Sequence, residues 1–150
     1  MKKIISVLLI LVMAMSMVAC NSTDADKTTE TTIATKATIS PIEEAKSLLQ
    51  SAYDTCCTGK GKTEYAKLGY DKMSLVIDTK PDNGYFAYED DAVSAIVMIN
   101  TYLVLPSSLT EKMSSTRALD GTQSQNCGKY TVTWNYHPDN GLKVIYEVNP

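Results

Sequence analysis

The sequence of residues 41–150 predicts an α+β domain, in which a short antiparallel sheet of two hairpins or a meander packs against two to three helices. Apolar residues recur at helical spacing in the segments 41–57 and 92–105, whereas they alternate with polar residues in 72–80 and again in 130–148. A length of about 110 residues is enough for one hydrophobic core, so we expect a single domain.

The first predicted helix covers residues 41–57 and has a clear start signal. Ser40 is placed to be the N-cap, Pro41 takes the first helical position, and Glu43 is placed to complete a capping box. The apolar residues that follow repeat every three or four positions, which predicts one buried face. Two glycines come shortly after the segment and end the helix.

Two further helices are predicted in the middle of the chain. Three acidic residues, 89–91, precede the apolar segment 92–105, and the helix dipole favours acidic groups at that end. Nearly all sides of this segment are apolar, so we expect a central helix that is buried on most sides and that ends before Pro106. The sequence Ser-Leu-Thr-Glu at 108–111 repeats the capping-box pattern and predicts a short third helix that ends near Ser115.

The segment 72–80 is predicted to be a half-buried strand, because its apolar residues fall on alternate positions. The turn sequence Pro-Asp-Asn-Gly follows at 81–84. Residues 85–88 are a candidate return strand, and the sequence leaves open which of its faces is buried. Residues 116–125 are predicted to form another strand that is interrupted by an Asp-Gly pair.

The end of the chain gives the clearest hairpin signal, and its loop length follows from which residues share a face. Large apolar residues alternate along 130–136 and again along 142–148. Directly paired residues point to the same side of a sheet, so the two apolar sets coincide only if the loop has an odd number of residues. Loops of 139–141 and 137–141 both meet this condition, and the first would give Gly141 the left-handed conformation of a type I turn plus bulge.

The first twenty residues read MKKIISVLLILVMAMSMVAC and have the pattern of an export signal. Two lysines precede an apolar run that is too short to cross a bilayer comfortably. The final Met-Val-Ala-Cys resembles the lipobox of bacterial lipoproteins, whose cysteine is diacylated before the signal is cleaved. This resemblance implies that residues 1–19 are a signal peptide and that Cys20 carries a lipid.

Residues 20–40 are predicted to join the lipid to the domain as a spacer. The segment 21–40 contains seven threonines, mixed charges and only two large apolar residues, so it cannot bury enough apolar surface to order itself. Its typical end-to-end distance is roughly 25 Å. Two acyl chains hold a protein firmly on a bilayer. We therefore expect the domain to be held on the outer, extracytoplasmic face of the cell membrane.

The domain is mildly acidic and rich in tyrosine. Residues 41–150 contain ten basic and fourteen acidic side chains, a net charge of −4, so nucleic acid is not an expected partner. The chain has nine tyrosines and one tryptophan. Tyrosine combines a large contact area with a hydroxyl group, which suits the recognition of proteins or sugars. The candidate binding surface is an exposed row of Tyr65, Tyr70, Tyr85 and Tyr88.

Three cysteines remain in the domain, Cys56, Cys57 and Cys127. The first two fall at a predicted helix C-terminus, where the dipole disfavours a thiolate, so neither is expected to be a nucleophile. A disulfide from Cys127 to either Cys56 or Cys57 is a candidate cross-link outside the cytoplasm. Together with His137 these cysteines have the ligand types for zinc but not the usual spacing, so no metal or other cofactor is expected.

His137 is the single histidine and lies two residues before Asp139. The pair is a candidate general base with its carboxylate, but catalysis also needs a nucleophile or a shaped pocket, and the sequence identifies neither. The stretches TRALDGTQS and YHPDNGLKVIYE resemble domains of uncharacterised small bacterial lipoproteins, which implies no activity. We favour a non-enzymatic binding role with an envelope protein or glycan as partner. The alternative is a small envelope hydrolase that uses His137 and nearby carboxylates.

The lipid anchor can be tested at its attachment residue. Cys20→Ala removes the sulfur that would carry the acyl chains, so we expect this variant to lose its lipid and to accumulate as an uncleaved precursor. Labelling of cells with an alkyne fatty acid, followed by membrane fractionation, measures both effects. Cys127→Ala is the control and should be labelled like the wild type. Equal labelling of Cys20→Ala and the wild type would contradict the assignment.

Overall fold

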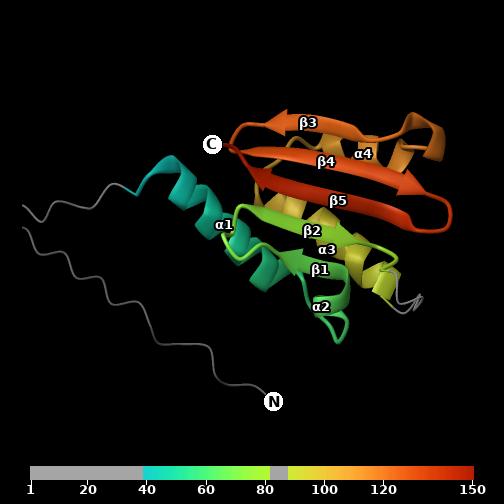
Figure 1. Cartoon of the computed structure of the whole chain (residues 1–150), viewed down its shortest axis with the longest axis horizontal. Coiled ribbons are helices and arrows are strands. Elements are labelled where there is room, and N and C mark those ends of the chain that lie inside the picture. Colours follow the sequence, from blue (N-terminus) through green and yellow to red (C-terminus); the bar gives the residue numbers. More distant parts are fainter. Residues whose placement is uncertain (1–38, 82–87) are drawn as a thin grey trace, which may run out of the picture. The chain divides into compact units, whose positions relative to one another are not determined.

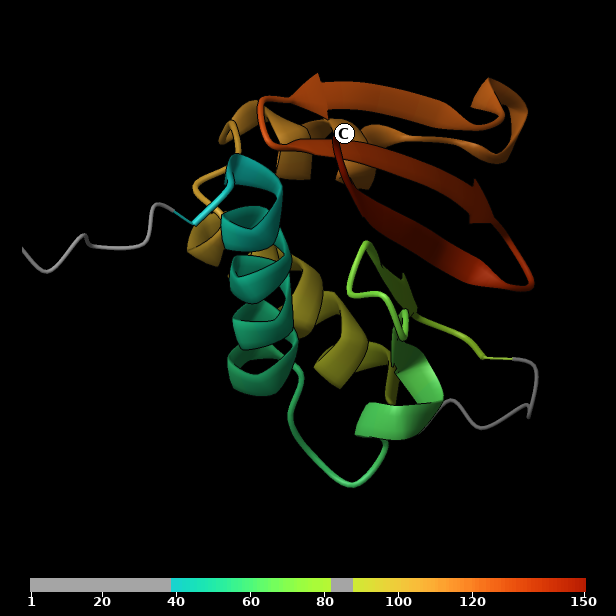
Figure 2. The same ribbon diagram turned by 60° about the vertical axis from the view of Figure 1, so that its left-hand side comes forward.

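The computed structural model describes residues 39–81 and 88–150 (Figure 1). These residues form an α+β domain whose five-stranded antiparallel sheet has the strand order β1-β2-β5-β4-β3. Helices cover one face of the sheet, and Figure 2 shows α1 and α3 side by side in this layer. The predicted fold class is therefore confirmed, with more strands in the sheet than two hairpins would supply.

Three of the helices in the described residues match the predicted ones. The Ser40 hydroxyl accepts a hydrogen bond from the Glu43 amide at 3.2 Å and so caps α1 as expected. The capping box predicted at 108–111 is wrong, because Ser108 is already the first residue of α4 and the N-cap, Ser107, makes no side-chain hydrogen bond to the helix. The four-residue α2 was not predicted, because so short a segment shows no periodicity. None of the described helices is long and apolar enough to cross a bilayer. The helices are α1 (Pro41–Cys56), α2 (Lys62–Tyr65), α3 (Glu89–Tyr102), α4 (Ser108–Ser115) and the 3-10 helix η2 (Ala118–Asp120).

The strands differ from the expectation at the start of the sheet and in the segment 116–125, where residues 118–120 form the 3-10 helix η2 and the strand begins only at Gln123. β2 lies between β1 and β5, and it pairs with β1 on one side and with β5 on the other. Of the candidate return strand at 85–88, residues 85–87 lie outside the described residues, and Tyr88 is the N-cap of α3. β1 has three residues, too few for alternation to reveal it. The strands are β1 (Ala66–Leu68), β2 (Ser74–Asp78), β3 (Gln123–Cys127), β4 (Tyr130–His137) and β5 (Gly141–Val148).

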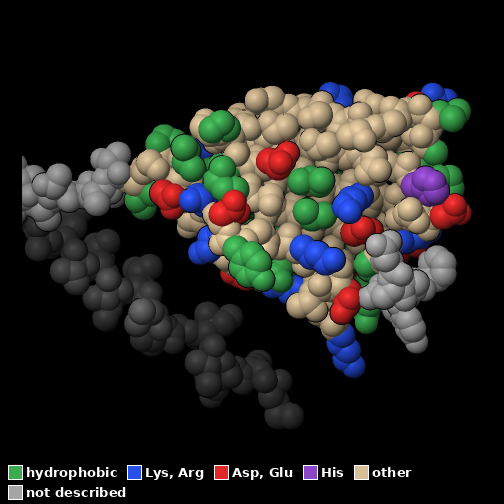
Figure 3. Space-filling view, in the orientation of Figure 1, with side chains coloured by type: hydrophobic (Ala, Val, Ile, Leu, Met, Phe, Trp, Pro, Cys, Tyr) green, Lys and Arg blue, Asp and Glu red, His purple; other side chains and the backbone are tan. Residues whose placement is uncertain are grey.

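Alternation along the strands decides which side chains reach the core. Leu75 and Ile77 of β2 are buried beneath the helices, as are Val144 and Tyr146 of β5. Their sequence neighbours point to the opposite face, which none of the described helices covers. Figure 3 looks onto this open face, and uncharged polar groups and backbone cover most of its β3–β4 half. The sheet thus has one buried and one solvated face, as antiparallel sheets often do.

The β4–β5 hairpin has the predicted odd loop. His137 pairs with Gly141 and Tyr136 pairs with Leu142, so residues 138–140 connect the strands. The pairing of Tyr136 with Leu142 is the one implied by the predicted loop 137–141, although His137 and Gly141 also pair and shorten the loop to 138–140. It brings the two apolar sets onto the same face of the sheet, which is why the alternating pattern of both arms ends in the core.

Gly141 is required at the start of β5 for two separate reasons. Its φ of +72° lies in the left-handed region that glycine adopts without strain. A β-carbon at this position would also overlap the Thr79 hydroxyl oxygen, which accepts a hydrogen bond from the Leu142 amide at 2.8 Å. Gly121 has a similar φ of +66°, but no other atom lies within 4 Å of the place where its β-carbon would be.

Substitutions at Gly121 and Gly141 separate the cost of backbone strain from the cost of a steric overlap with a neighbouring side chain. Gly121→Ala should cost about 1–3 kcal/mol of unfolding free energy, because its φ of +66° and ψ of −155° lie in a region that only glycine adopts readily, while no contact opposes the new methyl group. Gly141→Ala should cost a further ~1–3 kcal/mol, because the new methyl group must also displace Thr79. Urea unfolding of both variants measures the difference. Equal losses in the two variants would show that the contact with Thr79 does not restrict this position.

α3 is less buried than the sequence predicted. Val93, Val97 and Met98 are between 44 and 47 % exposed, so the expectation of a helix buried on most sides is wrong. The helix layer is only one helix deep, and its central helix therefore keeps an outward face. α4 has eight residues and cannot cover the full length of α3. The buried residues of α3 are Ala92, Ala95, Ile96, Ile99 and Asn100.

Candidate functional site

An apolar groove lies between α3, α4 and the end of the β4–β5 hairpin. It has a volume of about 500 Å³, within the range of ligand pockets in proteins. Apolar side chains from all three elements form most of its walls. They are Val93, Ile96 and Val97 of α3, Met113 of α4, and Tyr136 and Leu142 of the hairpin.

The groove exists because the hairpin continues beyond the helices that cover the sheet. Tyr136 lies on the same face of β4 as the buried Trp134, yet it is 39 % exposed. Val93 and Val97 are one helical turn apart on α3 and face the same groove. Apolar side chains from a strand and a helix thus line one hollow without filling it.

Buried hydrogen bonds hold the walls of this groove in place. The Tyr146 hydroxyl donates to Asn100 Oδ1 at 2.9 Å, and Asn100 Nδ2 donates to the Thr110 hydroxyl at 3.0 Å. The same Nδ2 lies 3.8 Å from the sulfur of Met113. Burial raises the pKa of Tyr146 well above its usual value, so its hydroxyl stays protonated and donates. These bonds connect β5, α3 and α4 through one buried amide.

Charged groups lie at the end of the groove nearest the start of α3. Glu89 and Lys80 both line it, and Asp90 follows Glu89 in the first turn of the helix. The hydroxyl groups of Thr110 and Ser114 add neutral polar atoms on the α4 side. The groove therefore combines an apolar interior with a polar rim, which is the usual composition of a binding site.

The predicted row of exposed tyrosines does not form. Tyr65 is 1 % exposed, and its hydroxyl accepts from the Thr58 amide at 2.9 Å and donates to the Thr58 carbonyl at 2.8 Å. Burial raises the pKa of Tyr65 to about 12. Tyr70 is fully exposed, Tyr88 packs partly against the core, and Tyr85 lies outside the described residues. Tyr65 is a core residue because it anchors the loop between α1 and α2.

The candidate disulfide is not formed in this structure, where Cys56, Cys57 and Cys127 are all free. Cys127 pairs with Tyr130, whose hydroxyl donates to the carbonyl of Ala45 near the start of α1 at 2.9 Å. Cys56 ends the same helix, about 16 Å further along its axis at 1.5 Å per residue. A disulfide needs Cα atoms about 4.4–6.8 Å apart, so this helix separates Cys127 from both Cys56 and Cys57.

Cys56 and Cys57 are buried at the C-terminal end of α1. Burial raises the pKa of Cys56, and it raises the pKa of Cys57 to about 11. Lys62 acts in the opposite direction on Cys57 but does not offset the burial. Both thiols are therefore protonated near neutral pH and contribute as small apolar groups in the core.

His137 and Asp139 lie together at the tip of the β4–β5 hairpin. Nδ1 of His137 accepts a hydrogen bond from the Asp139 amide at 3.1 Å and lies 3.8 Å from the Asp139 carboxylate. Both side chains are exposed, and neither lines the groove. The imidazole therefore holds the turn. Within 39–81 and 88–150, no three His, Cys, Asp or Glu side chains gather as a metal site would require.

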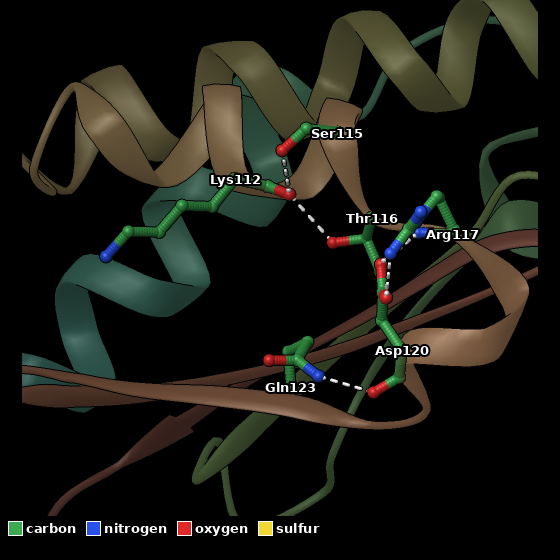
Figure 4. Close-up of polar contacts among 6 residues, drawn as sticks. All are labelled: Lys112, Ser115, Thr116, Arg117, Asp120 and Gln123. Atoms are coloured by element: carbon green, nitrogen blue, oxygen red, sulfur yellow. Dashed lines mark hydrogen bonds and ion pairs between the residues drawn. The ribbon is translucent and has the colours of Figure 1, made fainter.

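The connection from α4 to β3 is held by its own polar contacts (Figure 4). The Asp120 carboxylate accepts hydrogen bonds from the amide of Arg117 at 2.7 Å and from its guanidinium at 3.1 Å, which lowers the pKa of this carboxyl. Gln123 Nε2 donates to the Asp120 carbonyl at 2.6 Å. Trp134 Nε1 donates to the Thr116 hydroxyl at 2.8 Å. This segment fixes the position of β3 beside β4.

Sequence reasoning missed the groove, because α3 is apolar on its exposed side as well as on its buried side. The alternation of β4 likewise gives Tyr136 the same pattern as a core residue. The chain matches no protein-family model, and comparisons with curated proteins and with solved structures give no significant match. The geometry of the groove is therefore the basis for assigning a function.

Proposed function

We propose that the protein is a lipid-anchored extracytoplasmic binding protein whose groove takes an apolar side chain of a partner polypeptide. The observation that carries this proposal is the groove itself, about 500 Å³ in volume with apolar walls from α3, α4 and the hairpin. Exposed apolar surface that is concave and rimmed by polar groups is typical of protein interaction sites. The lipid on Cys20 would hold this site at the membrane surface.

Charge selects among polypeptide partners. At the α3 end of the groove, the carboxylate of Glu89 and the ammonium group of Lys80 both line the wall. A segment with a large apolar side chain followed by a basic residue would place its positive charge beside the Glu89 carboxylate. Such rim charges chiefly affect specificity and the rate of association, whereas the apolar side chain contributes most of the affinity.

Binding is preferred to the hydrolase alternative because of where His137 lies. Its imidazole and the carboxylate of Asp139 are exposed at the hairpin tip, on the solvent side of the loop. The largely apolar groove is a separate feature of the same end of the domain. A reaction that used His137 would leave the groove without a part in the chemistry.

The proposal can be tested with two synthetic probes, acetyl-Trp-Lys-amide and acetyl-Trp-Glu-amide. We expect the lysine probe to shift the methyl NMR signals of Val93, Val97 and Met113 in the mature chain. The glutamate probe should bind several-fold more weakly, because its charge repels Glu89. Val97→Asp should reduce binding of the lysine probe at least tenfold, since it places a carboxylate in the apolar wall.

Met98→Asp is the matched control for the groove variant. Met98 is the next residue of α3 and is 47 % exposed, close to the 44 % of Val97, but it does not line the groove. It should leave binding unchanged. If both variants weaken binding equally, or if the shifts fall on the open face of the sheet, the groove is not the binding site.

A further inference from the structure

β3 forms one edge of the sheet, and the direction of its backbone groups follows from the neighbouring strands. The Val148 amide donates to the Met73 carbonyl at 2.8 Å, so the backbone of Val148 points toward β2. Tyr130 lies opposite Val148 and therefore directs its own amide and carbonyl away from β5, toward Cys127 of β3. The Cys127–Tyr130 pair is thus hydrogen-bonded.

Because backbone direction alternates along a strand, the direction of the remaining amides and carbonyls of β3 follows. Gln123 and Gln125 point their backbone groups at β4, as Cys127 does, whereas Ser124 and Asn126 point theirs away from the sheet. Their two amides and two carbonyls form a row along the outer edge of β3. Four backbone groups in this arrangement are a template for a further antiparallel strand.

The side chains of β3 do not protect this edge. The strand reads Gln-Ser-Gln-Asn-Cys over 123–127 and contains no charge and no proline, the two features that commonly block edge pairing. The opposite edge of the sheet differs, because β1 has three residues and carries the exposed Lys67. The two edges of the same sheet are therefore unequal, and no strand within 39–81 and 88–150 pairs with the outer side of β3.

We propose that a second copy of this chain pairs with β3 antiparallel, about a two-fold axis at Gln125. Ser124 of each copy then faces Asn126 of the other, and their four amides and four carbonyls form hydrogen bonds across the axis. On the helix side of the sheet, Gln125 faces Gln125 of the second copy, and Gln123 faces Cys127. The strand is electrostatically compatible with a second copy of itself, because residues 123–127 contain no charged side chain that would face another of like sign.

Space for the second strand is present beside β3. A hollow of about 320 Å³ lies along its helix side, with Lys112 and Asp120 among its lining residues (Figure 4). Nζ of Lys112 donates to Gln125 Oε1 at 2.8 Å, and Gln125 Nε2 donates to the sulfur of Cys127 at 3.6 Å, so one of the two N–H groups of this amide is left for the second copy. Glutamine side chains of both copies would meet in this hollow.

The pairing of two β3 strands buries little surface area. Its stability therefore depends on holding both copies on one membrane. Two five-residue strands bury less area than a standard stable interface, and we expect association to be weak in dilute solution. Two copies whose lipids share one membrane face each other at a much higher effective concentration. Dimers should therefore form on vesicles at protein amounts that leave the chain monomeric in detergent-free solution after its lipid is removed.

Cysteine cross-linking tests the register directly. Gln123→Cys in the lipid-carrying mature chain places a new thiol opposite native Cys127 of the second copy, in a pair whose Cα atoms are about 4.5 Å apart. Within one chain the same two residues are four positions apart on a strand, about 13 Å, and cannot join. On phosphatidylglycerol-phosphatidylethanolamine vesicles with copper-phenanthroline as oxidant, we expect a disulfide-linked dimer whose 123–127 bond is identified by mass spectrometry.

Two variants make the outcome decisive. Ser124→Cys adds an exposed thiol one position away, where it faces Asn126, and it should cross-link at least fivefold more slowly. Ser124→Pro, added to Gln123→Cys, removes an outward amide that β4 does not use and should suppress the dimer while circular dichroism stays unchanged. Equal cross-linking of Gln123→Cys and Ser124→Cys, an absence of dimer on vesicles, or a dimer that persists with Ser124→Pro would overturn the proposal.

Discussion

The hydrogen bond from the Tyr146 hydroxyl to Asn100 joins the middle of the sheet to the middle helix of the layer above it. Tyr146 is fully buried and Asn100 is 4 % exposed, so water cannot replace either partner. The amide of Asn100 passes the connection on to Thr110 of α4. One buried side chain therefore sets the positions of both helices that form the groove. A buried amide whose hydrogen bonds are all made favours one arrangement of the elements around it, because any shift leaves a polar atom unpaired.

The described helices cover only one face of the sheet that Tyr146 belongs to, and the two proposed surfaces follow from this. On the covered face, a short α4 and an extended hairpin leave a hollow with apolar walls. At the edge, β3 has uncharged side chains and outward backbone groups. The groove uses α3, α4 and the β4–β5 hairpin, whereas the edge uses the outward backbone groups of β3, and α4 contributes residues both to the groove and to the hollow beside β3. A copy paired at β3 would leave the groove open to a partner.

Much of the fold could be predicted because its signals are local. The cap at Ser40, the alternation in β4 and β5, and the odd loop before Gly141 each depend on a few neighbouring residues. What failed depends on long-range contacts. The sequence cannot show that Tyr130 contacts the start of α1, and that contact places Cys127 far from Cys56. Nor can it show that Tyr65 anchors a loop, which turned a candidate surface residue into a core residue. The groove was missed for the same reason, because its walls come from three separate elements.

The most direct test of this account is the free energy of urea unfolding of Tyr146→Phe, compared with Tyr136→Phe. The first change removes a single buried oxygen and leaves Asn100 Oδ1 without its donor. We predict a loss of about 1–3 kcal/mol for Tyr146→Phe, the usual cost of an unsatisfied buried polar group. Tyr136 is 39 % exposed, and its loss should stay within about 0.5 kcal/mol. Equal and small losses in the two variants would contradict the view that the Asn100 hydrogen bonds hold α3 and α4 over the sheet.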